Sequence, residues 1–222
     1  MDTAGKDGII KHVMSGLNPA GVLVYSFKQP TVEEQRHDYL WRAHKVTPGR
    51  GRMTIFNRSY YEDVIVTRVH PHLLGEFQEQ AGKNGGSFWL QRFRDIECFE
   101  RYLVDNNIFI LKFFLHISKE EQKKRFVKRL DDDSKHWKFS ASDLQERGYW
   151  DQYVHAYEDV LRHTASSAPW YVIPANHKWF ARLAIADVIV DRLKQLHPEY
   201  PQASPEIQEL LAKAKAAIES EP

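Results

Sequence analysis

Four short apolar runs, separated by stretches with helical spacing, limit the fold of this chain more than any other feature. The runs cover residues 22–27, 52–57, 108–116 and 170–173. Apolar runs of this kind are typical of strands buried on both faces. Strands that alternate with helices predict a parallel sheet flanked by helices, which binds ligands at the carboxyl ends of its strands. We therefore expect an α/β domain over residues 1–200 and a C-terminal tail over residues 201–222.

The helices are predicted from apolar spacing and from their start signals. Thr31 with Glu34, and Ser118 with Glu121, match the capping box, in which two side chains satisfy amides of the first turn. Residues 82–87 are rich in glycine and are expected to form a mobile loop, because glycine adopts regular structure at an entropic cost. The expected helices cover residues 9–14, 31–44, 60–67, 88–104, 118–130, 143–163, 178–196 and 206–218.

Charge and cysteine content narrow the class of protein. Lys and Arg total 31 against 30 Asp and Glu, so a net charge of +1 gives no general attraction to nucleic acid or to an anionic membrane. Any anion site must be a local basic cluster. The single cysteine, Cys98, excludes an internal disulfide and a cysteine-based zinc site within one chain. No apolar run approaches the roughly 20 residues that cross a bilayer, so we expect a cytoplasmic protein without membrane or nucleic-acid partners.

The first eight residues, MDTAGKDG, match the second half of a phosphate-binding loop. The full motif is glycine, four arbitrary residues and then Gly-Lys-[Ser/Thr], and its amides and lysine cradle phosphate oxygens at a helix N-terminus. Gly5 and Lys6 are in register, and Asp7 stands where Ser or Thr is expected. The first glycine of the motif would precede Met1. Taken alone, a solvated turn is the alternative interpretation.

Two further stretches carry charges that suit phosphoryl transfer. Arg58, Glu62 and Asp63 follow the run at residues 52–57, where carboxylates can hold Mg²⁺ and an arginine can neutralise a phosphoryl group. The alternative is a solvated start of a helix. Between residues 119 and 138, basic residues crowd around Trp137 and predict a flexible lid over a polyanion, with a solvated helix face as the alternative.

Five strings of this sequence together resemble the type 2 polyphosphate kinases: DTAGKDG, FNRSYYEDV, KFFLHISKEEQ, WKF and APWYVIPAN, beginning at residues 2, 56, 112, 137 and 168. The resemblance runs from residue 1 to about residue 196. It implies a P-loop kinase fold similar to that of thymidylate kinases, with a helical lid at about residues 119–145. It also implies transfer of phosphoryl groups between inorganic polyphosphate and nucleotides with Mg²⁺. The second string is most similar to the branch that accepts AMP and ADP.

The resemblance also implies roles for individual residues. Asp2 would position the metal and activate the acceptor, and we rank it first among the Mg²⁺ ligands, ahead of Glu62 and Asp63. Related branches carry Asp where Asn57 stands, and an amide is only a neutral donor to Mg²⁺. The residues expected to contact phosphate, nucleotide or the transferring group are Gly5, Lys6, Asp7, Gly8, Lys11, Asn57, Arg58, Arg125, Arg129 and Lys138.

We expect direct in-line transfer without a covalent enzyme intermediate, in a homo-oligomeric enzyme. Two alternatives stay open: a nucleotide kinase that uses ATP as donor, and an inactive, truncated homologue that binds polyphosphate. In P-loop kinases the strand before the loop is central to the sheet, and its loss exposes unpaired backbone groups. We therefore expect the first central strand to be absent from this chain. We also expect the native gene to encode this strand and the first glycine upstream, and the chain that lacks the strand to be unstable or incomplete.

Overall fold

The computed structural model describes residues 3–138, 141–200 and 202–220. The chain divides into two units, Met1–Ala186 and Asp187–Pro222. The first unit carries every described strand and the candidate site. The second contains the later part of one helix and the last helix of the chain.

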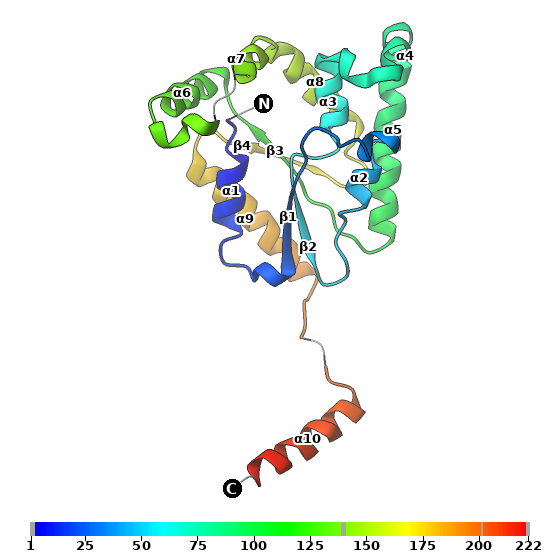
Figure 1. Ribbon diagram of the computed structural model, residues 1–222, viewed down its shortest axis with the longest axis vertical. Helices are drawn as coiled ribbons and strands as arrows, with labels where there is room; N and C mark the ends of the chain where they lie inside the picture. The colour runs from blue at the N-terminus through cyan, green and yellow to red at the C-terminus, as the bar shows by residue number, and fades with distance from the viewer. Residues whose placement is uncertain (1–2, 139–140, 201, 221–222) are drawn as a thin grey trace. The chain divides into compact units, whose positions relative to one another are not determined.

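The described strands are short and parallel, as the apolar runs predict (Figure 1). The first pairs with the second from Val22 opposite Met53 to Ser26 opposite Asn57, and the third pairs with the fourth in the same way. No described strand is hydrogen-bonded to both pairs, and residue 3 already lies in the turn before the first helix. The strands are β1 (Val22–Ser26), β2 (Met53–Asn57), β3 (Lys112–His116) and β4 (Trp170–Pro174).

Helices lie before, between and after these strands, which confirms the α/β prediction. Figure 1 shows α3, α5 and α8 gathered on one side of the strands and α1 and α6 on the other. Short 3₁₀ turns occupy Pro19–Gly21, Glu34–Arg36, Pro71–Phe77 and Asp133–Lys138. The α-helices are α1 (Lys6–Val13), α2 (Trp41–His44), α3 (Glu62–Val69), α4 (Gln78–Lys83), α5 (Gly85–Asp105), α6 (Lys119–Leu130), α7 (Ala141–Gly148), α8 (Trp150–His163), α9 (Lys178–Gln195) and α10 (Pro205–Glu219).

A hydrophobic cluster of buried side chains lies where α3, α5 and α8 meet. Val64 of α3, Ile96 of α5 and Val160 of α8 are fully buried in it. Burying such side chains stabilises the fold by about 1.5–3 kcal/mol each. The cluster fixes the helices that support the ends of β1 and β2.

One charged pair is buried beside this cluster. Lys112 donates to Glu100 at 2.6 Å, and Glu100 also accepts hydrogen bonds from the hydroxyls of Tyr60 and Tyr61. Burial raises the pKa of Glu100 and lowers the pKa of Lys112, while their mutual attraction opposes both shifts. The pair ties α5 to β3 and to the segment that follows β2.

Three expectations about helices were wrong. The capping box of Thr31 and Glu34 forms, but the chain leaves the helix after one turn, and Asp38 caps a new start by accepting from the amides of Leu40 and Trp41. Residues 82–87 are no loop: α4 ends at Lys83 and α5 begins at Gly85. The helix expected over residues 143–163 is two helices, because α7 ends at Gly148, a poor helix former, and α8 begins at Trp150.

Candidate functional site

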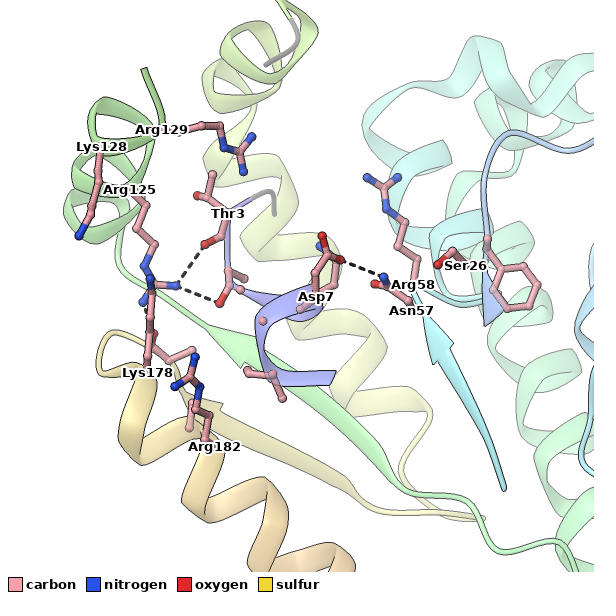
Figure 2. A pocket seen from close by; sticks show the side chains of 18 of the residues that line it. Thr3, Asp7, Ser26, Asn57, Arg58, Arg125, Lys128, Arg129, Lys178 and Arg182 are labelled. Carbon is pink, nitrogen blue, oxygen red and sulfur yellow. Dashed lines mark hydrogen bonds between the residues drawn. The ribbon is translucent and has the colours of Figure 1, made fainter. Parts of the chain in front are cut away.

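A cavity of about 630 Å³ lies at the carboxyl ends of the strands, where a parallel sheet is expected to bind its ligands. The loop before α1 and the first turn of α1 form one wall, and α6 and α9 form another (Figure 2). Segments after β1, β2 and β4 complete it. The described lining consists of residues 3–9, 26–29, 57 and 58, with Arg125, Lys128, Arg129, Ala175, Lys178, Ala181 and Arg182.

The charge of this cavity is strongly one-sided. Asp7 is the carboxylate of the described lining. The cations of the lining are Lys6, Lys28, Arg58, Arg125, Lys128, Arg129, Lys178 and Arg182. A concave surface lined by one sign of charge concentrates ligands of the opposite sign. The cavity therefore suits a ligand with several negative charges, although the whole chain is almost neutral.

The loop at residues 3–8 has the backbone of an anion-binding turn. Gly5 has a φ of 100°, a conformation that favours glycine, and it caps the N-terminus of α1. Its carbonyl accepts from the amide of Ile9 at 3.0 Å, so the amides of the first turn are directed beyond the helix end. Lys6 begins the helix and lines the cavity together with Gly8. The predicted loop therefore lies at the cavity wall, next to the other cations.

Arg125 of α6 binds backbone carbonyls of two other segments. Its Nη1 donates to the carbonyls of Thr3 and Ala4 at 3.1 and 2.9 Å. Its Nη2 donates to the carbonyls of Ala175 and Asn176 at 2.5 and 3.1 Å. The side chain thus joins the lid helix, the loop and the turn after β4.

The remaining donor of Arg125, Nε, binds Glu121 at 2.8 Å, so the five N–H groups of the guanidinium make five hydrogen bonds. The side chain is 10% exposed. We expected Arg125 to clamp polyphosphate or the transferring group. This geometry instead favours a positioning residue that holds the loop in place.

Arg129, one turn further along α6, lines the cavity as expected and pairs with Asp143 of α7 at 3.3 Å. Arg147 of α7 donates to the carbonyl of Lys119 and to the side chain of Gln122 at 2.9 and 2.6 Å. These contacts connect α6 and α7, the two helices of the region predicted as a lid.

Asn57 and Arg58 lie at the end of β2, on the opposite side of α1 from α6 (Figure 2). The amide nitrogen of Asn57 donates to Asp7 at 3.0 Å, whereas its Oδ1 is buried without a hydrogen-bond partner among the described residues. Arg58 has a φ of 65°, unusual for a residue with a side chain, and pairs with Glu62 at 3.5 Å. A buried oxygen without a hydrogen-bond donor, beside a carboxylate, can accept a cation as its partner.

Two of the expected metal ligands, Glu62 and Asp63, do not line the cavity. Asp63 pairs with Arg42 at 2.8 Å, and burial raises its pKa against the lowering effect of that arginine. Neither Asp63 nor Glu62 lines the cavity, and the same is true of Lys11, which is exposed on α1. Asp2 and the side chain of Lys138 lie outside the described residues.

The described part of the chain offers no group of three His, Cys, Asp or Glu side chains that could hold a metal ion. Mg²⁺ does not need one, because it keeps several waters and binds through one or two carboxylates and the phosphates of a substrate. The carboxylate of Asp7 and the orphaned Oδ1 of Asn57 are oxygen donors of the right type. The residues present therefore fit a divalent cation bound together with phosphate.

Sequence reasoning missed Lys28, which follows β1, and Lys178 and Arg182 of α9. Lys28 follows the carboxyl end of β1, and Lys178 begins the helix after β4, with Arg182 one turn further along it. The rule that singled out Arg58 after β2 applies equally to β1 and β4 and could have found them.

This chain is similar to known proteins over most of its length. A chain from Rhodopseudomonas palustris, named ADP-polyphosphate phosphotransferase, is 51% identical over 92% of this chain and 72% of its own length. The AMP/ADP-polyphosphate phosphotransferase of Meiothermus ruber is 47% identical over 91% of this chain and 72% of its own length. The crystal structure of polyphosphate kinase 2 from Arthrobacter aurescens superimposes with a TM-score of 0.83 at 43% identity, covering 96% of this chain and 73% of that one.

None of the described helices combines the length and apolar character that spanning a bilayer requires. The family model for polyphosphate kinase 2 (PPK2) matches residues 1–201. This chain therefore belongs to the polyphosphate kinase 2 family.

Proposed function

We propose that this protein transfers phosphoryl groups between inorganic polyphosphate and AMP or ADP, forming ADP or ATP. The observation that carries the proposal is the one-sided charge of the cavity around the loop of Gly5 and Lys6. Both substrates are polyanions, and a single cavity must hold them end to end for direct transfer. The printed names of the two relatives above, which specify ADP and AMP/ADP as nucleotides, support the choice of acceptor.

Catalysis in this geometry consists of positioning and charge neutralisation. Phosphoryl transfer passes through a transition state in which negative charge spreads over the oxygens of the transferring group, so fixed cations lower the barrier. Lys6 and the amides of the first turn of α1 lie at the loop, and Arg58 and Arg129 face it from opposite sides. No side chain has to form a covalent intermediate.

A divalent cation, Mg²⁺ in this proposal, would be held by Asp7 and Asn57 with Asp2, and would supply further neutralisation of the phosphate charge. The contribution of Asp2 stays a prediction, as do the cytoplasmic location and assembly into a homo-oligomer.

The decisive variant is Lys6→Ala in the full chain, measured by ATP formation from polyphosphate and ADP. We expect a loss of at least about a hundredfold in kcat, because a cation fixed beside the transferring group is removed. Lys11→Ala is the matched control: it removes the same charge from the same helix outside the cavity. Equal activity of the Lys6 variant and the control would refute the assignment.

The donor needs its own measurement, since an ATP-dependent nucleotide kinase would use the same loop. Polyphosphate and ATP are compared as donors with AMP as acceptor at equal phosphoryl concentration. We expect product only, or at least tenfold more of it, with polyphosphate. Faster turnover with ATP would favour the ATP-dependent kinase.

A further inference from the structure

Arg58 has a backbone conformation that a residue with a side chain rarely adopts. It lines the cavity just after β2, and its φ of 65° lies in the left-handed region, where a Cβ is strained. Strain of this kind persists only where the surrounding structure holds the residue in place. The ion pair of Arg58 with Glu62 is a weak hold, because the arginine side chain is 49% exposed. Other contacts must fix this part of the chain.

Two consecutive side chains after Arg58 are anchored on one carboxylate. The hydroxyls of Tyr60 and Tyr61 donate to the same oxygen of Glu100, Oε1, at 2.8 and 2.7 Å. Glu100 of α5 is fully buried, and both tyrosines are buried as well. Burial and the charge of Glu100 raise the pKa of both tyrosines, so their hydroxyls stay protonated and can donate. The shared acceptor fixes the turn through which the chain passes from Arg58 into α3.

The carboxylate of Glu100 is itself held from its other side. Its Oε2 accepts from Lys112 of β3 at 2.6 Å. Lys112 also donates to the hydroxyl of Tyr61 at 3.1 Å and to the carbonyl of Thr164, after α8, at 2.5 Å. The orientation of the carboxylate is therefore set by groups from three separate segments of the chain.

Stability alone is a weak reason for this arrangement. A buried ion pair costs desolvation, and apolar side chains of similar volume often stabilise a fold as well or better. A connected polar network adds a single geometry, because each hydrogen bond has a preferred length and direction. Here the network ends only two residues from Arg58, so the geometry that it fixes includes the position of that cation at the cavity.

We propose that Glu100 is a positioning residue for phosphoryl transfer, which acts through Tyr60 and Tyr61 to hold Arg58 in its left-handed conformation at the cavity. Neither Glu100 nor the two tyrosines belong to the described cavity lining, so their effect on a ligand is indirect. The part of Arg58 in the reaction rests on the proposed function, whereas the contacts that hold it do not.

The test is a double-mutant cycle in kcat for ATP formation from polyphosphate and ADP, with the full chain. Tyr60→Phe with Tyr61→Phe removes both hydroxyl bonds and should lower kcat about tenfold, because Arg58 shifts. Arg58→Ala should lower kcat about a hundredfold. The variant with all three changes should match Arg58→Ala within about twofold, because the tyrosines act through the arginine. A fall of about a thousandfold, the product of independent effects, or an unchanged kcat in the tyrosine variant would overturn the proposal.

A second buried carboxylate of α5 supplies the control for lost stability. Glu97 accepts from the hydroxyls of Ser166 and Ser167. Ser166→Ala with Ser167→Ala therefore removes two hydroxyl bonds to a buried glutamate of the same helix and leaves the segment after β2 intact. It should lower the midpoint of thermal unfolding, as the tyrosine variant does, but keep kcat within about twofold of the parent protein. A tenfold fall in its kcat would mean that general destabilisation explains the tyrosine variant as well.

The cycle is also run with ATP as donor and AMP as acceptor, which separates this proposal from the proposed function. Non-additive effects in an ATP-dependent reaction alone would contradict polyphosphate as donor and support the positioning of Arg58. Additive effects in a protein that uses polyphosphate would do the reverse. If neither donor gave product, the proposed function would fail, and the same cycle in the affinity for tripolyphosphate, measured by calorimetry, would decide the positioning.

Discussion

Arg125 offers the sharpest test of how this site is built, because its role in the structure differs from the role that its position in a basic helix predicts. The Arg125→Ala substitution removes five hydrogen bonds at once, four of which Arg125 donates to carbonyls of the loop and of the turn after β4. A hydrogen bond from a charged donor contributes about 1.5–3 kcal/mol, but bonds from one side chain do not add. Since the side chain is 10% exposed, we expect a loss of about 3–5 kcal/mol, as for breaking a buried ion pair.

The same change should lower kcat more than it raises KM. Without Arg125, the carbonyls of Thr3 and Ala4 lose the contact that holds the loop against α6, and a shift of about 1 Å in a positioning element can cost about a hundredfold in rate. KM for polyphosphate should change less than threefold, since all five donors of Arg125 already bind protein groups. Arg125→Lys should recover little, because a single ammonium cannot reach carbonyls on two segments.

Three measurements decide this prediction: urea unfolding, the midpoint of thermal unfolding and initial rates of ATP formation. A loss of 3–5 kcal/mol corresponds to about 10 °C in a chain of this size. Arg129→Ala is the control on the same helix: it removes the pair with Asp143 at 3.3 Å but leaves the bonds of Arg125 to the loop and to the turn after β4 in place, so stability should fall less than in Arg125→Ala. A rise of tenfold or more in KM for polyphosphate, with kcat and stability unchanged in Arg125→Ala, would show that Arg125 binds phosphate and that our reasoning is wrong.

Two other substitutions test the core and the metal site. Lys112→Met leaves the buried carboxylate of Glu100 without its cation and should lower the free energy of unfolding, measured by urea titration, by about 3–5 kcal/mol. The double variant Lys112→Met with Glu100→Leu should recover part of that loss. A double variant no more stable than the single one would contradict this prediction. Asp7→Asn removes the carboxylate of the described cavity lining and should raise the Mg²⁺ concentration that gives half-maximal activity about tenfold. An unchanged Mg²⁺ requirement would exclude Asp7 as a ligand.

The strands could be predicted from the sequence because short apolar runs between segments of helical spacing are typical of a parallel sheet, although Leu23 and Val24 of β1 and Val172 of β4 are exposed rather than buried in this structure. The helices were less predictable where polar side chains compete for backbone amides. Asp38 is such a case: its carboxylate begins a new helix inside a segment that otherwise has the spacing of a single one. The capping box of Thr31 and Glu34 forms as predicted, although the helix that it starts ends after one turn. Neither this box nor the apolar spacing of the segment therefore reveals that the helix is interrupted before Asp38.

The roles of the charged residues in the site were also only partly predictable from the sequence. Arg58 and Asp63 follow a strand in the sequence and Arg125 lies on a basic helix face, which predicts that the two arginines contact the substrate and that Asp63 binds Mg²⁺. Whether a charged side chain is available to a substrate or metal depends on its protein partners, and these come from distant segments. Asp63 forms an ion pair with Arg42, and Arg125 donates hydrogen bonds to four backbone carbonyls. Every residue has a backbone carbonyl, so neither composition nor spacing shows which carbonyl accepts from an arginine. An arginine that is bound to the protein and one that is available to a ligand therefore have the same appearance in the sequence. A cation whose donors are all bound to the protein is therefore the least available to a substrate, and by this criterion Arg125 ranks behind the other cations of the cavity lining.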